Sequence, residues 1–267
     1  MKSIYRWLTC HPKLAKLLIA IAVTIFALIF LNPKFFSPLI RYVIVFFMLF
    51  YGFLFVNTAP EKLIREPVMI WEQQCDPYPF LEELERQLPL CKENLQGQLT
   101  HINYAMILGQ VGQYEKALAE MQRINIDRFP ATAPVVKYIY YNNLCDTLTK
   151  LERFDEAEIW YRKACQIYED LPSNKLKQKL SYNVQMNEIE EMYREKDFSG
   201  ALRKLSWLSC ETQRSVMDAA LLAARCNLAL EEQEKAKEKL QYVIDHGNRL
   251  YCVDIAKELL NTMTESV

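Results

Sequence analysis

The chain has 267 residues, a net charge of −1 at neutral pH and 51% hydrophobic residues. This length is enough for a large hydrophobic core or for two separate parts. The charge is uneven, because residues 1–66 carry eight Lys or Arg against two Glu, which leaves the remainder acidic. An acidic soluble part argues against nucleic-acid binding, because phosphate recognition needs a basic surface.

Two apolar runs near the N-terminus predict a membrane hairpin. They extend from Leu14 to Leu31 and from Leu39 to Val56, and each contains a single basic residue close to its start. A helix of about 18 residues is roughly 27 Å long, which just spans a bilayer core. A short segment with two prolines, residues 32–38, separates the runs. We therefore predict a transmembrane hairpin over residues 1–57, with spans at about 14–31 and 39–57, held in the lipid bilayer through residues 14–57.

The basic residues around the hairpin predict its orientation, because Lys and Arg favour the cytoplasmic side. Four precede the first run or lie at its start, two follow the second, and the turn side holds Lys34 and Arg41. We expect an integral protein of a bacterial cell membrane, with the N-terminus and the soluble part facing the cytoplasm; an organelle membrane is the alternative. A cleaved signal peptide is disfavoured by the Asn-Pro-Lys-Phe-Phe after Leu31. One span plus an interfacial or re-entrant helix stays open, since both runs are short.

The eight cysteines form no CxxC motif and no cluster. Several lie at apolar positions of predicted helices, where a free thiol acts as a small hydrophobe. Buried reduced thiols are the prediction, and they imply a reducing compartment.

Prolines dominate the stretch that follows the hairpin. Pro60, Pro67 and Pro77 predict a linker over residues 58–78. A helix is expected at about 79–88, where Leu81, Leu84 and Leu88 recur at helical spacing.

A short motif repeats in the soluble part. The segment Gly112-Gln113-Tyr114-Glu115-Lys116-Ala117-Leu118 returns at residues 152–157, at 196–202 and more weakly at 234–237. Each copy lies between two helical stretches, which indicates stacked helix pairs. The predicted pairs are 95–108 with 114–124, 138–151 with 154–169, 176–194 with 198–208, and 216–230 with 233–246, followed by a capping helix at 251–262.

The repeats place small residues at the expected helix crossings and aromatic residues at the start of the second helix. In both features the sequence resembles the tetratricopeptide repeat (TPR) family over residues 95–246. The intervals between the signature alanines are 40, 44 and 35 residues, so longer first helices or loops are expected at residues 126–135 and 170–179. The predicted fold is all-α: the transmembrane hairpin, then a TPR-like α-solenoid over residues 79–267. Other helical repeats, or a helical bundle, are the alternatives. The matching residues are Ala105, Tyr114 and Ala117; Cys145, Phe154 and Ala157; Phe198 and Ala201, with Ile189 as a departure; and Ala224 and Ala236, with Gln233 as a departure.

By this resemblance, the first helix of each pair lines a concave groove. Asn103, Asn143 and Asn187 each precede a signature alanine by fourteen residues, and an amide at this position can hold a peptide backbone. Asn is also common there for structural reasons, so a solvated or structural role is the alternative. The remaining groove candidates are Asn142, Asp146, Lys150, Asn183, Glu190, Arg194 and Arg225. Their mixed charge predicts a polar or mixed-charge peptide.

Tyr138, Tyr140 and Tyr141 lie close to Trp160 and Tyr161 on predicted helices. They are interpreted as core residues, and a recognition patch is the alternative.

No pattern in the sequence indicates catalysis. The chain has six glycines and no phosphate-binding loop, and its three histidines lack metal-ligand spacing. We expect no catalytic residues, no metal, no cofactor and no small-molecule substrate.

The most consistent interpretation is a membrane-anchored adaptor that binds a protein or peptide partner. A structural subunit of a membrane complex, with the hairpin making the essential contacts, is the alternative. An enzyme is a third, which would need a site that the sequence does not reveal.

Overall fold

The computed structural model describes residues 2–31, 34, 36–91, 95–130 and 133–265. All regular elements in these ranges are helices, which confirms the all-α prediction. The chain forms two compact units: residues 1–66 together with 85–100, and residues 67–84 together with 101–267.

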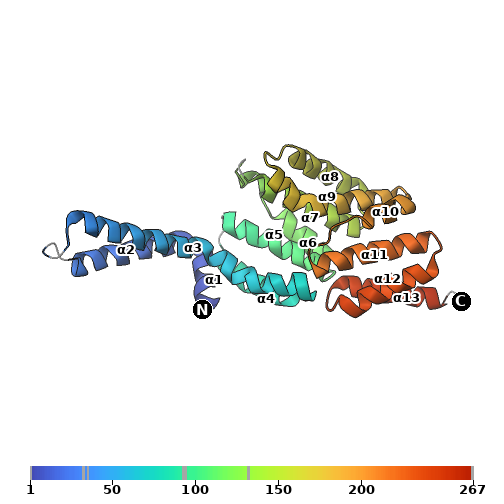
Figure 1. Cartoon of the computed structure of the whole chain (residues 1–267), viewed down its shortest axis with the longest axis horizontal. Helices are drawn as coiled ribbons and strands as arrows, with labels where there is room; N and C mark the ends of the chain where they lie inside the picture. Colours follow the sequence, from blue (N-terminus) through green and yellow to red (C-terminus); the bar gives the residue numbers. More distant parts are fainter. Residues whose placement is uncertain (1, 32–33, 35, 92–94, 131–132, 266–267) are drawn as a thin grey trace. The chain divides into compact units, whose positions relative to one another are not determined.

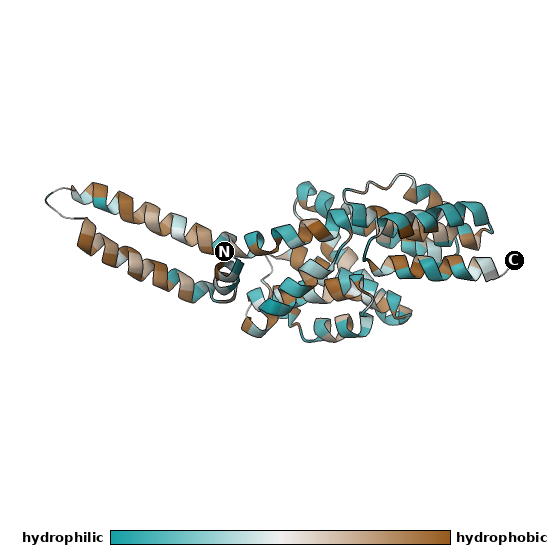
Figure 2. Ribbon diagram, turned by 90° about the horizontal axis from the view of Figure 1, so that it is seen from below, coloured by the Kyte–Doolittle hydropathy of each residue, from teal (hydrophilic) through white to brown (hydrophobic). Residues whose placement is uncertain are grey.

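The first unit contains an antiparallel helical hairpin (Figure 1). It is built from α2 (Pro12–Phe30) and the first part of α3 (Pro38–Gln74), and both helices are long and apolar enough to cross a membrane. Both helices consist mainly of hydrophobic residues, as the brown ribbon in Figure 2 shows. Many of these side chains are exposed, and Leu28 is 80% exposed. Residues 32, 33 and 35 of the predicted turn lie outside the described residues.

A short helix, α1 (Lys2–Cys10), lies crosswise at the base of this hairpin (Figures 1 and 2). The helical path breaks at His11, and Pro12 then starts α2, where its missing N–H costs nothing. Leu8 of α1 packs with Ala15, Val56 and Ala59 in one buried cluster. This cluster holds α1 against both hairpin helices.

The predicted linker is wrong in its local structure, because α3 continues as a helix through Pro60 and Pro67 to Gln74. An interior proline removes one backbone hydrogen bond and does not force the helix to stop when neighbouring groups compensate. The chain leaves the helix at Cys75, whose φ of 56° is left-handed.

The helices after α3 match the predicted pairs. The helix predicted at 79–88 is α4, followed by the short helix η1 before Cys91. The insert at 170–179 lengthens the first helix α9, whereas the insert at 126–135 contains η2 and only the first two residues of α7. The elements are α4 (Tyr78–Gln87), η1 (Leu88–Leu90), α5 (Leu95–Gln110), α6 (Tyr114–Gln122), η2 (Ile126–Arg128), α7 (Pro134–Lys150), α8 (Phe154–Glu169), α9 (Asn174–Arg194), α10 (Phe198–Leu205), α11 (Gln213–Ala229), α12 (Gln233–His246) and α13 (Tyr251–Glu265).

One turn geometry recurs between the two helices of every pair and explains the repeated motif. Gly112, Glu152, Lys196 and Glu231 all have a positive φ, between 58° and 77°. The amide of the following residue then donates to the carbonyl five residues earlier, which satisfies an end group of the first helix. These bonds are Gln113 to Leu108, Arg153 to Leu148, Asp197 to Met192 and Glu232 to Asn227, each 2.9 Å.

The four signature alanines of the second helices, Ala117, Ala157, Ala201 and Ala236, are fully buried, as the close-crossing prediction requires. The aromatic residue at the helix start does not always fill the wedge. The ring of Tyr114 packs against Tyr251 and that of Phe198 against Tyr193, with centroids 5.8 and 5.4 Å apart. Phe154, by contrast, is 46% exposed and has no ring partner among the described residues, so the prediction is wrong there.

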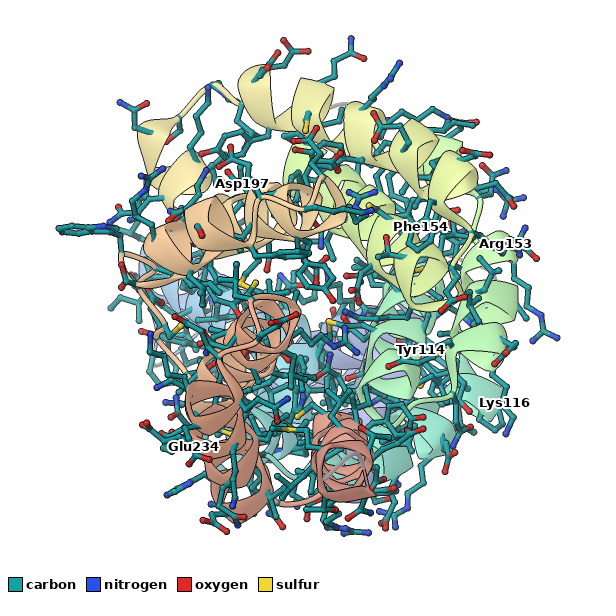
Figure 3. All side chains as sticks on the ribbon, turned by 90° about the vertical axis from the view of Figure 1, so that its right-hand side faces the viewer. Tyr114, Lys116, Arg153, Phe154, Asp197 and Glu234 are labelled. Atoms are coloured by element: carbon teal, nitrogen blue, oxygen red, sulfur yellow. The ribbon has the colours of Figure 1, made fainter. Side chains whose placement is uncertain are left out.

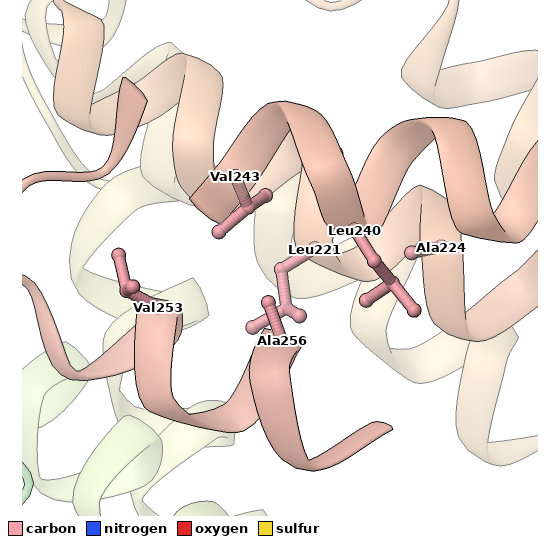
Figure 4. Packing of buried hydrophobic residues seen from close by; sticks show 6 residues of the cluster. All are labelled: Leu221, Ala224, Leu240, Val243, Val253 and Ala256. Atoms are coloured by element: carbon pink, nitrogen blue, oxygen red, sulfur yellow. The ribbon is translucent and has the colours of Figure 1, made fainter. Parts of the chain in front are cut away.

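The C-terminal helices share a hydrophobic core (Figure 4). Side chains of α11, α12 and α13 interlock there, and α13 covers the apolar side of the last pair as the predicted cap. The cluster consists of Leu221, Ala224, Leu240, Val243, Val253 and Ala256.

The second unit also closes on itself. Arg249, in the turn before α13, bonds through its amide to the Cys75 carbonyl at 3.2 Å, and its guanidinium lies 3.9 Å from the Tyr78 ring. The Asn248 amide donates to the Gln74 carbonyl at 2.8 Å. In Figure 3, Tyr114, Phe154, Asp197 and Glu234 follow one another around this unit. The last repeat therefore returns to the segment that precedes the first one, a contact that we call the clasp (residues 74–78 with 248–249).

Candidate peptide-binding face

The ten predicted groove residues all lie on first helices of the repeats, and all are partly exposed. Asn103 is on α5; Asn142, Asn143, Asp146 and Lys150 are on α7; Asn183, Asn187, Glu190 and Arg194 are on α9; and Arg225 is on α11.

Two of these asparagines bind each other and connect neighbouring repeats. The Asn187 amide on α9 donates to Asn142 Oδ1 on α7 at 2.8 Å, and the Tyr138 hydroxyl donates to the same oxygen at 3.3 Å. The Asn142 oxygen already has two donors, so these groups fix the spacing of α7 and α9. For Asn142 and Asn187, these bonds therefore directly support the structural role, which was the alternative to peptide binding.

A charged cluster lies one turn further along the same helices. Lys150 Nζ is 3.3 Å from Glu190 Oε1 and 3.7 Å from Asp146 Oδ1. The Glu190 carboxylate raises the pKa of Lys150 strongly, more than burial lowers it, and Asp146 adds to the effect. Because the Lys150 side chain is only 29% exposed, this ion pair is weakly screened by solvent.

Helix α11 adds a second pair that the sequence analysis did not identify. Arg214 Nη1 is 2.7 Å from Asp218 Oδ2, one helical turn away. Burial raises the pKa of Asp218 and also that of Asp146, although Arg214 and Lys150 respectively oppose the shift. The i, i+4 spacing of Arg214 and Asp218 was the available signal, but this spacing alone is equally typical of an exposed helix surface.

Three nitrogen donors on these helices are buried and make no hydrogen bond with any described residue. They are Asn143 Nδ2 on α7, Arg194 Nε on α9 and Arg214 Nε on α11. Arg194 also pairs with Glu191 through its terminal nitrogen. Buried donors are nearly always paired, so these three nitrogens call for acceptor atoms such as carbonyl or carboxylate oxygens.

The remaining predicted residues, Asn103, Asn183 and Arg225, form no hydrogen bond or ion pair with the groups just described. Asn103 and Asn183 make no side-chain hydrogen bond with the described part of the chain. Arg225 lies near enough to the cluster to lower the pKa of Lys150, yet it forms no ion pair there. These three side chains are available to an external ligand.

A pocket of about 170 Å³ opens between α7, α8 and α9. Its polar wall includes Asn187 and Glu188, and its aromatic wall consists of Tyr138, Tyr161 and Tyr168. Tyr138 and Tyr140 are both buried, which confirms them as core residues. Tyr141 instead stacks on Trp160 at 5.6 Å, with the Lys163 ammonium 4.1 Å from the Trp160 ring.

The described residues contain no group of three side chains that could hold a metal ion. The His101 ring lies 2.9 Å from Glu120, which also binds Arg123. This is an ion-pair arrangement of the kind found on many helix surfaces, and it includes no nucleophile.

Comparison with known proteins agrees with the repeat geometry. Residues 82–245, more than half of the chain, match the family described as the SusR N-terminal TPR domain. No curated protein and no solved structure matches the chain.

Proposed function

Because the chain belongs to the SusR N-terminal TPR domain family, we propose that it is an adaptor that holds a protein or peptide partner at a membrane. A role in protein interaction is the general property of TPR domains, and helical repeats present extended concave surfaces for it. The proposal goes further in three respects: which face of the repeats binds the partner, which side of the membrane the repeats lie on, and which residues attach the chain to the bilayer.

The observation that carries the proposal is the set of unpaired donors on the first helices. Asn143, Arg194 and Arg214 each present a buried nitrogen without an acceptor, and they come from three successive first helices, α7, α9 and α11. The three side chains are themselves partly exposed, so a rotation of each can bring its covered nitrogen to the surface. An extended peptide offers carbonyl oxygens at regular intervals, so one strand of main chain can then satisfy several donors. Asn103, Asn183 and Arg225 supply additional polar contacts, while Asp146, Lys150 and Glu190 make the face both acidic and basic.

Attachment to the bilayer is assigned to residues 1–57, with residues 58–78 leading to the repeat domain at 79–267. The support is the outward apolar surface of two helices of sufficient length and the excess of basic residues at their base. This excess favours a cell membrane with both the N-terminus and the repeats in the cytoplasm. A tethered groove meets membrane-bound partners at a raised effective concentration, so weak binding is enough.

Peptide arrays probed with the full chain in detergent test the binding face. Wild-type protein should retain a subset of extended peptides. Arg194→Ala combined with Asn143→Ala should weaken that binding by at least about tenfold, since each lost charged or polar contact is worth roughly 1–3 kcal/mol. Arg162→Ala is the matched control, because this arginine on α8 is 78% exposed. Equal binding by both variants would contradict the assignment of the face.

The second candidate is a structural subunit of a membrane complex. It is favoured by α3, which replaces the expected linker with continuous helix from Pro38 to Gln74. Exchange of residues 1–57 for an unrelated anchor separates the two functions. Retained partner binding supports the adaptor, whereas loss of the complex with intact peptide binding supports the structural subunit.

A further inference from the structure

Helix α1 has two different sides. Leu8, Thr9 and Cys10 are buried, whereas Ile4 is 58% and Trp7 38% exposed. The Trp7 ring stacks on His11, with centroids 5.5 Å apart. Tryptophan is enriched where hydrocarbon meets lipid headgroups, so an exposed Trp beside an exposed Ile is typical of a helix lying in that layer.

The position of α1 along the hairpin is set by the residues against which it packs. Its Leu8 contacts Ala15, at the start of the first apolar run, and Val56, at the end of the second. Cys10 is also close to residues at the end of α4, with its sulfur 3.9 Å from the Gln87 carbonyl. The crosswise course of α1 (Figure 1) is therefore fixed at the level where the apolar surface of the hairpin ends.

Basic side chains gather at the same level. Lys13 and Lys16 lie in the first turns of α2, and Lys62 follows Val56 by about 9 Å of helix. The Lys62 ammonium lies 5.3 Å from the Phe55 ring and 5.9 Å from the Tyr5 ring of α1. Arg65 is exposed one turn further on. These charges fall within the depth occupied by phospholipid headgroups.

Acidic groups do not cancel this charge. Six of the eight Lys or Arg in residues 1–66 lie at this end, because Lys34 and Arg41 are on the turn side. Glu61 and Glu66 oppose these six, and Glu66 is paired with Lys2 at 2.9 Å. Each basic group close to an anionic bilayer surface contributes to attraction.

We propose that α1 is an in-plane membrane helix and that its surroundings form a binding site for anionic phospholipid headgroups. Ile4 and Trp7 enter the upper acyl layer, while Lys13, Lys16, Lys62 and Arg65 bind the headgroup phosphates. The proposal rests on the membrane attachment proposed above and adds a lipid preference to it.

Hydrogen exchange of the full chain in nanodiscs tests the site. The probes are phosphatidylcholine alone and phosphatidylcholine mixed with phosphatidylglycerol, and the readout is the exchange rate of peptides that cover α1. Exchange should be at least about fivefold slower in the anionic discs, the factor expected from one basic group at the surface. Lys13→Gln with Lys62→Gln should remove that difference. Lys235→Gln with Lys237→Gln, at exposed positions of α12, should preserve it.

A second variant separates insertion from charge. Trp7→Ala should accelerate the exchange of α1 in both lipids, whereas Trp7→Phe should retain most of the protection. Exchange of α1 that does not depend on lipid charge, in a chain that has entered the discs, would overturn the headgroup site and leave the anchor intact. A chain that fails to enter either disc would overturn both.

Discussion

At the scale of single residues, the repeated turn between paired helices is decided by one backbone conformation. Gly112 is the only glycine among the four residues that adopt it, and the others are Glu152, Lys196 and Glu231. The left-handed region is strained for residues with a Cβ atom. At Gly112 space is an additional reason, because a Cβ atom would lie 2.6 Å from the ring of Tyr251.

Substitutions at this left-handed turn position should therefore change the free energy of unfolding in opposite directions in different repeats. Gly112→Ala should destabilise the second unit by about 1–3 kcal/mol, through backbone strain and displacement of Tyr251. Glu152→Gly should stabilise it by about 0.5–1 kcal/mol, because the strain at φ 58° is relieved. Urea unfolding followed by circular dichroism measures both, and the same sign for the two variants would contradict this account of the turn.

The thiols should differ widely in reactivity. A hydrogen bond with Cys10, 3.7 Å away, is the main cause that lowers the pKa of Cys91 to about 7, and burial opposes it. Burial raises the pKa of Cys145 and of Cys252 to about 12. Iodoacetamide near neutral pH should therefore modify Cys91 first, since the thiolate is the nucleophile.

Peptide mapping over a time course gives these rates. Cys10→Ala should slow the modification of Cys91 by removing its main hydrogen-bond partner. Modification of Cys145 or Cys252 ahead of Cys91 would contradict the order of thiol pKa values given above. For the proposed membrane orientation, Cys91 is therefore a better labelling site than either of these two shielded thiols.

Two partly buried carboxyls, those of Asp146 and Asp218, predict a pH dependence of stability. Burial raises the pKa of Asp146 and Asp218 above the ordinary value of 3.8. The folded chain then binds protons more tightly than the unfolded chain, so their contribution is present at low pH and declines as pH rises through the raised pKa values. Between pH 4 and pH 7, Asp218→Asn should lose less unfolding free energy than wild type. Asp254→Asn, at a 69% exposed site, is the matched control, and a larger decline in Asp218→Asn would contradict the prediction.

At the scale of helices, local pattern was enough to predict the repeat elements. Each predicted pair exists, and the alanines at the crossings are buried, because both features depend on residues close together in sequence. The prediction failed where distant groups decide. Three features depend on residues that are distant in sequence but close in space. They are the continuation of α3 past Pro60 and Pro67, the exposure of Phe154 and the bond from Asn187 to Asn142.

The clasp is the clearest of these long-range features, and it makes a separate prediction. Arg249 contacts Asp76 at 3.3 Å and the Tyr78 ring at 3.9 Å, residues more than 170 positions earlier in the chain. Arg249→Ala should cost about 1–2 kcal/mol, through the cation–π contact and a partly exposed ion pair. Arg153→Ala, which loses an exposed pair with Glu156 within one helix, should cost less than about 0.5 kcal/mol.

Hydrogen exchange localises the effect of the clasp. In Arg249→Ala, amides of residues 74–84 and of α13 should exchange faster, while those of α8 keep their wild-type rates. Uniform acceleration across the second unit, or none, would show that the clasp is not a local connection.

At the scale of the whole molecule, the proposed function assigns attachment to the apolar hairpin and recognition to the helical repeat domain. The first helices α7, α9 and α11 carry both the bonds that hold the repeats together and the unpaired donors that suit a peptide. Sequence reasoning could propose this face from the asparagine register. It could not distinguish Asn142 and Asn187, which bind each other, from Asn143, which retains an unpaired donor, because that difference depends on the spacing of two helices.

The most direct test is photo-cross-linking of the full chain in its native membrane, with a benzophenone side chain at a single position. Asn103 and Asn183 are the best sites, because neither has a side-chain hydrogen bond to lose. Arg162, on the exposed surface of α8, is the control position. The account predicts discrete protein adducts from positions 103 and 183 and none from 162. Adducts from 162 alone, or none from either groove position, would contradict it.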